Sequence, residues 1–135
     1  MTTNPFSKYL RKEDILHSQC CGILRLYPNL LWHHSPNEGK RSSYERFLMA
    51  KLGTKAGFPD LAIYNPCTLD GVHYVGMAIE LKSVLYVTKK GVVRVNVTTD
   101  NQKMWLTRLG ELGWYCKVIH EFNEFERTIK NGYGK

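Results

Sequence analysis

Long apolar runs, a signal peptide and a zinc-binding pattern are all missing from this sequence of 135 residues. No segment approaches the roughly 20 consecutive apolar residues of a transmembrane helix, and the first residues lack the charged and apolar regions of a signal peptide. The cysteines form no Cys-x-x-Cys pair and have no histidine partners at zinc-finger spacing. We therefore expect no membrane partner, a cytoplasmic location, and roles as small buried residues for Cys20, Cys21, Cys67 and Cys116.

Acidic residues are also scarce. The chain has 19 lysines and arginines against 12 aspartates and glutamates, a formal net charge of +7 and a pI near 9.3. This balance favours a polyanionic partner, with nucleic acid ahead of an acidic lipid surface. The length and the 43% hydrophobic content suit one ordinary core. We expect residues 1–135 to form a single domain, with residues 1–11, which show no periodicity, as an N-terminal arm.

Two charged residues lie in an otherwise apolar, strand-like segment at positions 76–83. Side chains alternate across a β-strand, so Glu80 and Lys82 would share one face, with the apolar side chains beside them on the other. Asp60 precedes a short apolar run and supplies a second carboxylate. Charges in a core strand must be paired, solvated or bound to a metal, and a divalent cation relieves the repulsion between two carboxylates. We therefore predict a metal site at Asp60 and Glu80.

This set of residues suits phosphodiester hydrolysis. A divalent ion held by two carboxylates lowers the pKa of a bound water and polarises a phosphate oxygen. Asp60 and Glu80 fit the ligand role, and the backbone carbonyl of Leu81 can add a third oxygen. Lys82 would stabilise developing negative charge and help to orient or deprotonate the water. The simpler alternative is that Lys82 only forms a salt bridge with Glu80 or a neighbouring acid.

Apolar periodicity predicts a first helix from Lys12 to about Tyr27, before Pro28. Its buried stripe is Leu16, Cys20, Ile23, Leu24 and Tyr27. Glu13 falls on the same stripe. Either it is an acid favoured in the first helical turn by the helix dipole, or it is a third acid directed toward the metal site.

A second helix is predicted over about 42–52, with a serine as N-cap and a glycine directly after it. We expect Phe47, Leu48 and Leu52 to face the core. The preceding residues 33–41 are turn-rich and polar, which is typical of a loop.

The remaining elements are predicted from apolar runs between turn signals. A strand and a longer strand pair as an antiparallel hairpin around Asp70-Gly71, and a second hairpin has a basic tip. The expected strands are 61–65, 72–82, 84–87, 92–97 and 114–119. Thr99-x-x-Gln102 has the form of a capping box that opens a helix. A final amphipathic helix is expected from Phe122, with residues 130–135 as a tail.

Basic residues near these motifs can neutralise phosphates by a salt-sensitive attraction that is independent of base sequence. The candidates are Lys40, Arg41, Lys55, Lys89, Lys90 and Arg94. Each of them, taken alone, also suits a solvated surface charge. The tryptophans are expected in the core and not as base-stacking platforms.

The order of the motifs resembles the PD-(D/E)xK nuclease superfamily and, more closely, its VRR-NUC family. An acid-bearing helix is followed by a basic loop, Gly-x-Pro-Asp at a strand start, a strand-borne Glu-x-Lys and a helix that opens with Thr-x-x-Gln. The matching segments are Glu13, 37–41, 57–60, 79–82 and 102–109. The resemblance covers residues 12 to about 130.

The resemblance implies a restriction-endonuclease-like α/β fold, an αβββαβ core with a mixed sheet flanked by helices. It implies a DNA endonuclease that uses Mg²⁺ or Mn²⁺ bound by Asp60 and Glu80, with Lys82 in catalysis. Glu13 would assist the metal site, and Gln102 would complete the catalytic pocket. The capping role of Gln102 stays equally open, and both roles hold only if its side chain is shared. Standalone phage and bacterial members imply a homodimer that cleaves branched or junction DNA in the cytosol of a bacterium or a phage-infected host.

Two departures from the family pattern bear on these assignments. His17 stands where members often have a glutamine one turn after the first glutamate, which makes Asp14 the fallback for Glu13. The segment between Lys82 and Gln102 is longer than in compact relatives, because it holds the ribbon 86–97. The alternative function is a non-cleaving nucleic-acid-binding module of the same fold. A small basic structural or RNA-associated protein is the third possibility.

Overall fold

The computed structural model describes residues 4–35, 42–87, 89–91, 93–95 and 97–134. Within them, a mixed four-stranded sheet has the strand order β1-β2-β5-β8. The strands are β1 Trp32–His34, β2 Leu61–Ile63, β5 Met77–Leu81 and β8 Tyr115–Ile119. β1, β2 and β5 pair antiparallel, and β8 pairs parallel with β5. The parallel pair requires a crossover connection, which a helix supplies.

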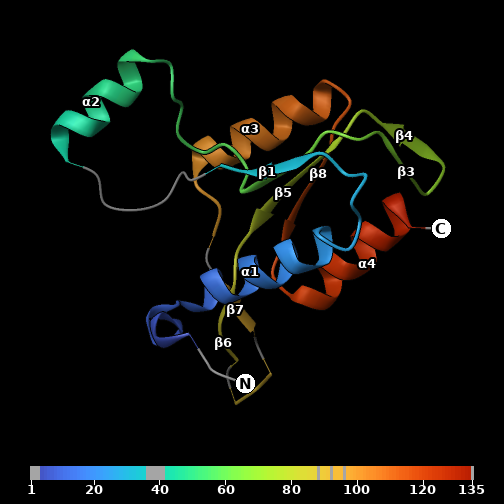
Figure 1. The fold of residues 1–135 in the computed structure, drawn as a ribbon, viewed down its shortest axis with the longest axis horizontal. Coiled ribbons are helices and arrows are strands. Elements are labelled where there is room, and N and C mark those ends of the chain that lie inside the picture. The colour runs from blue at the N-terminus through green and yellow to red at the C-terminus, as the bar shows by residue number, and fades with distance from the viewer. Residues whose placement is uncertain (1–3, 36–41, 88, 92, 96, 135) are drawn as a thin grey trace.

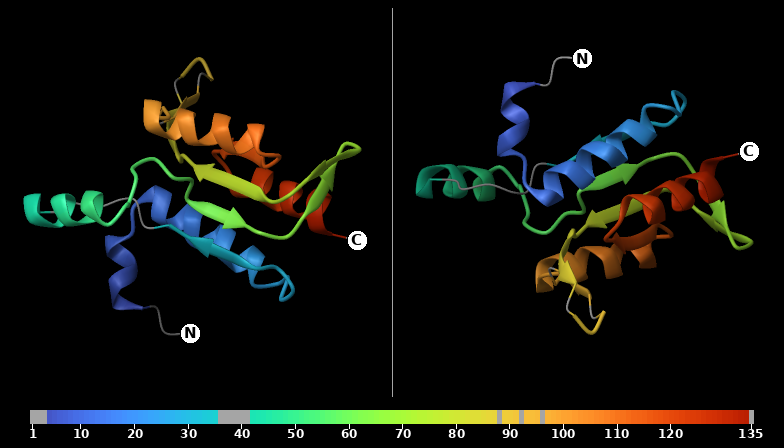
Figure 2. Two further views of the ribbon diagram at one scale, coloured as in Figure 1. Left: turned by 90° about the horizontal axis from the view of Figure 1, so that it is seen from above. Right: turned by 90° about the horizontal axis from the view of Figure 1, so that it is seen from below.

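Helices cover both faces of this sheet (Figure 1, Figure 2). α1 (Lys12–Leu24) and α4 (Phe122–Tyr133) pack against each other and against one face. α3 (Asp100–Glu111) is the crossover helix and packs on the other face, over β5 and β8. The predicted fold class, a mixed α/β sheet flanked by helices, is confirmed. In the part of the chain described, no helix is long and apolar enough to cross a membrane.

The core lies between the sheet and the α1–α4 pair. All residues of β5 are buried, and alternate side chains of β5 pack with those of β2 against the two helices. The buried helical side chains in this core are Leu16, Cys20, Leu24, Phe125 and Ile129. Ile23 and Tyr27 are partly buried against them, so the predicted stripe faces the core. α1 ends at Leu24 and not near Tyr27, because a tighter turn, with Tyr27 N–H donating to the Leu24 carbonyl at 3.0 Å, precedes Pro28.

The predicted strand 72–82 is in fact two strands, and the predicted strand 61–65 ends at Ile63. β4 (Val72–Tyr74) pairs with β3 (Cys67–Leu69) in a small hairpin of its own. Its turn residues Asp70 and Gly71 have positive φ, as a two-residue hairpin turn requires. Gly76 separates β4 from β5, where an added Cβ would lie 2.7 Å from both the Ile63 carbonyl oxygen and the Trp114 ring. β2 and β5 are therefore antiparallel neighbours that are linked through the β3–β4 hairpin.

Three further boundaries differ from the prediction. The N-terminal arm contains a short 3-10 helix, η1 (Pro5–Tyr9), capped by Asn4. The predicted loop 33–41 begins inside β1, because edge pairing with β2 makes a strand of a segment without an apolar pattern. α4 continues through the predicted tail to Tyr133, whose hydroxyl donates to the Asn65 carbonyl at 2.8 Å. The second predicted hairpin is present as β6 (Val84–Val87) and β7 (Val93–Val95).

α2 (Ser43–Lys51) forms as predicted, but it does not pack as predicted. The Ser42 hydroxyl caps it by accepting from Glu45 N–H at 3.1 Å. Phe47 and Leu52, expected in the core, are 62% and 74% exposed, and Leu48 is also exposed. Figure 1 shows α2 projecting away from the sheet. An amphipathic pattern tells which side of a helix is apolar and does not tell what covers it.

Candidate functional site

The sheet register brings Asp60 and Glu80 together. Leu61 pairs with Ile79 in the antiparallel β2–β5 ladder. One position further places Asp60 opposite Glu80, with both side chains on the α3 face. They are 5% and 1% exposed. The two carboxylates therefore converge at the end of two central strands.

Two backbone N–H groups and one imidazole ring hold Asp60 from both sides. Its Oδ2 accepts from Leu81 N–H at 2.8 Å, and its carbonyl accepts from Ser35 N–H and His34 Nδ1–H, both at 3.1 Å. The N–H and C=O of one strand residue point to the same edge, so the Leu81 carbonyl also faces the Asp60 side of β5. The contact of His34 with Asp60 was not predicted from the sequence, because only the pairing of β1 with β2 brings its ring there.

Burial raises the pKa of Asp60 above the usual carboxyl range. The Leu81 N–H, a hydrogen-bonding contact with the Glu80 carboxyl group, and the charges of Lys82 and His34 act in the opposite direction. Two carboxyl groups in one buried position carry both negative charges only if positive charge offsets them. Without a cation, Asp60 holds its proton more tightly than a solvated aspartate does.

Lys82 places a cationic side chain beside this pair. Its Nζ lies 3.8 Å from Glu80 Oε1, and the side chain is only 10% exposed. The separation is long for a charge-assisted hydrogen bond, which is usually about 2.7–2.9 Å. His120 Nδ1–H donates to the Lys82 carbonyl at 2.8 Å and fixes the backbone there. No motif in the sequence indicated His120, which becomes a neighbour of Lys82 through the parallel β5–β8 pairing.

Gln102 takes part in both interactions that the sequence left open. Its amide oxygen accepts from Thr99 N–H at 2.8 Å and completes the capping box of α3. Its amide nitrogen donates to Glu80 Oε1 at 2.9 Å. One side chain thus ties the start of the crossover helix to the carboxylate pair.

The turn before Asp60 is packed tightly against the start of α3. Gly57 has φ +91°, and an added Cβ would lie 2.6 Å from the Asn101 carbonyl carbon and 2.8 Å from Gln102 N. Trp105 Nε1–H donates to the Ala56 carbonyl at 3.0 Å, and the Trp105 ring meets the Phe58 ring edge-on. Glycine at position 57 therefore allows the Asp60 turn and Gln102 to approach one another.

Glu13 lies in the first turn of α1 and is partly buried. One turn later, the His17 ring packs edge-on against His34 with centroids 4.2 Å apart, so this end of α1 faces the Asp60 end of the sheet. Asp14, the fallback, accepts from Arg11 N–H at 2.9 Å, and Arg11 lowers its pKa. Among the described residues, no three His, Cys, Asp or Glu side chains are grouped closely enough to hold a metal ion.

The structure describes the predicted basic residues in part. Lys55 is exposed in the turn that leads to Asp60, and Lys89 and Lys90 are exposed between β6 and β7. The backbone of Arg94 lies in β7. Lys40 and Arg41 lie outside the described residues, as does the whole segment 36–41 of the predicted loop.

The fold is similar to that of a protein of known structure described as a VRR_NUC domain protein. The two share 21% sequence identity with a TM-score of 0.60, over 90% of this chain and 87% of that one. This similarity supports the VRR-NUC part of the resemblance at the level of the fold. No family model matches the sequence, and no curated protein matches it.

Proposed function

We propose that this protein is a divalent-metal-dependent endonuclease that hydrolyses phosphodiester bonds in DNA. The observation that carries the proposal is that the carboxylates of Asp60 and Glu80 are buried next to each other. The Lys82 amine and the Gln102 amide lie beside Glu80. Burying two carboxylates together costs free energy, and a bound cation would offset that cost. The similarity of the fold to that of a VRR_NUC domain protein also supports this function.

The donor atoms suit Mg²⁺ or Mn²⁺. Both are hard cations that take oxygen ligands, and Asp60, Glu80 and the Leu81 carbonyl are oxygen donors at the adjoining ends of β2 and β5. Three protein oxygens leave positions for water and for phosphate oxygens, which is the usual mode of Mg²⁺ binding at phosphate-processing sites. A cation bound there would lower the pKa of a coordinated water and polarise the phosphate.

The surrounding side chains have roles that follow from their contacts. Lys82 would stabilise the negative charge that develops on the phosphate, because its amine is mostly buried beside the carboxylates. Gln102 would orient Glu80 through its 2.9 Å hydrogen bond. Glu13, on the end of α1 that faces Asp60, would assist through an outer contact to the metal site.

DNA is the proposed partner because the chain is strongly basic. With a net charge of +7 it attracts a polyanion. Lys55, Lys89 and Lys90 would contact phosphates, and Arg94, Lys40 and Arg41 would extend this contact. Such contacts carry little base specificity, so we propose that the shape of branched or junction DNA selects the substrate.

We further propose that the active form is a homodimer. Tyr44, Phe47 and Leu52 give α2 and its end an exposed apolar surface, and a second copy of this chain is the occupant that a two-strand cut at a symmetric junction requires. Light scattering of wild type and Phe47→Glu tests it. A wild-type monomer at all concentrations would contradict the dimer and leave the nuclease proposal standing.

The nuclease proposal is tested with supercoiled plasmid and four-way-junction DNA in Mg²⁺ or Mn²⁺. We expect wild type and Glu111→Gln, a matched change of an exposed glutamate, to cut. Glu80→Gln and Lys82→Ala should lose at least about a hundredfold in rate, while their affinity for DNA changes little. DNA binding without cleavage by wild type would instead favour the non-cleaving binding module.

A further inference from the structure

The α3 face of the sheet carries a run of aromatic rings next to the carboxylates. His33 lies opposite Ala62 in the β1–β2 register, and Ala62 lies opposite Ala78. Tyr64 follows Ala62 by two positions and Asp60 precedes it by two, so all of these side chains share one face. The surface extends about 13 Å along β2, from Asp60 to Tyr64.

The rings contact one another in a continuous series. His33 and Tyr64 are stacked, with centroids 5.6 Å apart and planes at 11°, and Tyr64 Oη lies 2.9 Å from His33 Nδ1. Phe58 approaches His33 at 6.5 Å, and Trp114 meets Tyr64 edge-on at 5.7 Å. We name His33, Phe58 and Tyr64 the aromatic surface.

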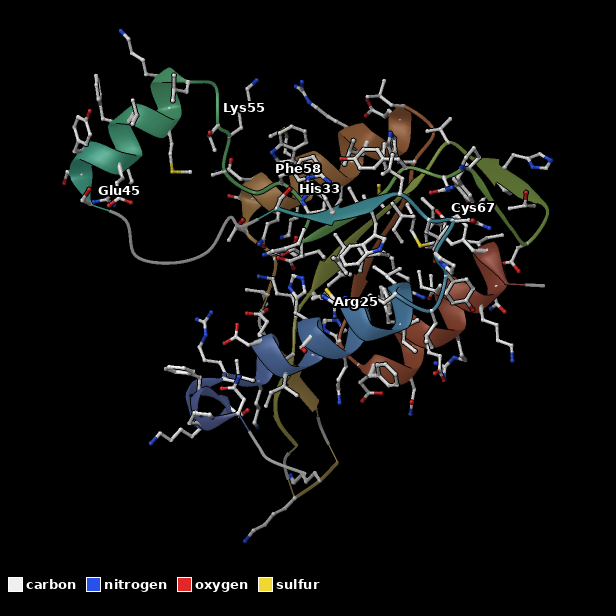
Figure 3. The ribbon with its side chains drawn as sticks, in the orientation of Figure 1. Arg25, His33, Glu45, Lys55, Phe58 and Cys67 are labelled. Carbon is white, nitrogen blue, oxygen red and sulfur yellow. The ribbon has the colours of Figure 1, made fainter. Side chains whose placement is uncertain are left out.

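Two members of the aromatic surface, His33 and Tyr64, are accessible, whereas Phe58 is half-buried beside Trp105 of α3. α3 packs over β5 and β8, away from the β1 edge. Tyr64 is 42% exposed and His33 is also exposed. Lys55 is exposed three residues before Phe58, in the turn that leads to Asp60, and Figure 3 labels both residues together with His33. The exposed rings of His33 and Tyr64 therefore lie on the sheet face that carries the carboxylates, and the basic Lys55 precedes this face in the turn before Asp60.

We propose that the aromatic surface binds the unpaired bases of a single-stranded DNA segment that adjoins the scissile phosphate. This inference rests on the proposed nuclease function and narrows its substrate class to branched DNA that carries an unpaired stretch beside the cut. Bases stack on aromatic rings without regard to sequence, while basic side chains follow the backbone. Lys55 supplies the positive charge next to the rings, and the shared face makes the surface continuous with the catalytic residues.

The test compares a fluorescein-labelled single strand with an abasic strand of the same length, by anisotropy in EDTA so that no cleavage occurs. We expect wild type to bind the base-bearing strand about tenfold more tightly. Tyr64→Ala should remove most of this preference, and Tyr64→Phe, which keeps the ring, should retain it. Phe6→Ala is the matched control, because Phe6 is 72% exposed and lies in η1. Quenching of tryptophan fluorescence by the base-bearing strand alone would support the proposal, since Trp114 adjoins Tyr64.

The results separate this inference from the nuclease proposal. A protein that cuts DNA but binds the two strands equally has no stacking surface, which overturns the inference alone. A protein that prefers the base-bearing strand but never cuts overturns the nuclease proposal. Rings that only shield the sheet would lower the melting temperature in Tyr64→Ala without a base-dependent change in affinity, and that result also overturns the inference. The same holds if an RNA strand of the same sequence binds more tightly than the DNA strand.

Discussion

β5 and α2 both carry apolar side chains and lie in opposite environments. Every residue of β5 is buried, and no residue of α2, which the structure describes in full, is buried. The charged Glu80 is 1% exposed, whereas Phe47 is 62% exposed. Packing partners, and not hydrophobicity alone, decide which side chain is covered. A buried charge and an exposed phenylalanine are both unusual, and we propose a partner for each. The partner is a cation for Glu80 and a second copy of the chain for Phe47.

The largest difference between the two regions should appear in stability. Ile79→Ala opens a cavity at the centre of β5, where the side chain is fully buried. We expect it to lower the free energy of unfolding by about 2–5 kcal/mol. Urea denaturation followed by circular dichroism measures this loss.

Phe47→Ala on α2 is the matched control and should cost less than about 0.5 kcal/mol in dilute protein. If the two substitutions had equal effects, β5 would not be the centre of the core as described.

Two glycines with the same backbone conformation provide a finer comparison. Gly57 and Gly53 have φ of +91° and +90°, but an added Cβ meets α3 only at position 57. Both alanine variants carry the backbone strain of about 1–3 kcal/mol. Gly57→Ala should be the less stable of the two and should also lose DNA cleavage.

Melting temperatures and plasmid nicking measure these effects. Equal behaviour of Gly57→Ala and Gly53→Ala would mean that the close approach of the turn to Gln102 has no importance.

The two interactions of Gln102 can be separated by a second variant. Thr99→Ala loses part of the helix cap and keeps the amide next to Glu80, and it should cost about 1 kcal/mol. Gln102→Ala should cost a similar amount and in addition reduce the cleavage rate. Rates per folded molecule, corrected by circular dichroism, show the difference. Equal loss of rate in both variants would assign Gln102 to the cap alone.

The smallest expected effect is a pH dependence of the protein's stability that arises from the titration of Asp60. The folded protein holds the Asp60 proton more tightly than the unfolded chain does, because burial raises its pKa. This contribution is fully present below the unfolded pKa of about 4 and is lost as pH rises through the raised value. In EDTA, the melting temperature of wild type should fall relative to Asp60→Asn as pH rises from 4. Adding Mg²⁺ at neutral pH should raise the melting temperature of wild type alone. If the melting temperature of wild type instead rose relative to that of Asp60→Asn with increasing pH, the pKa of Asp60 would be lowered by folding and not raised.

The sequence predicted the elements that have strong local patterns. Alternation in 76–83 indicated that Glu80 and Lys82 share a face, and the Thr-x-x-Gln box located the start of α3. β1 was missed because Trp32–His34 has no apolar pattern and becomes a strand only by pairing with β2. The contact of His34 with Asp60 depends on that pairing too, and the contact of His120 with Lys82 depends on the parallel pairing of β5 with β8, so no local signal could reveal either of them. The exposure of α2 could not be predicted from the sequence either, because the apolar pattern of Phe47 and Leu52 is the same whether the helix faces a core or solvent.

The central claim is that Asp60 and Glu80 are buried together in order to hold a divalent cation. Anomalous diffraction from crystals soaked in Mn²⁺ tests this claim most directly. We predict an anomalous peak within coordination distance of one oxygen of each carboxylate, about 2.0–2.3 Å, and its disappearance in Glu80→Gln. Well-ordered carboxylates with no peak between them at saturating Mn²⁺ would contradict the account.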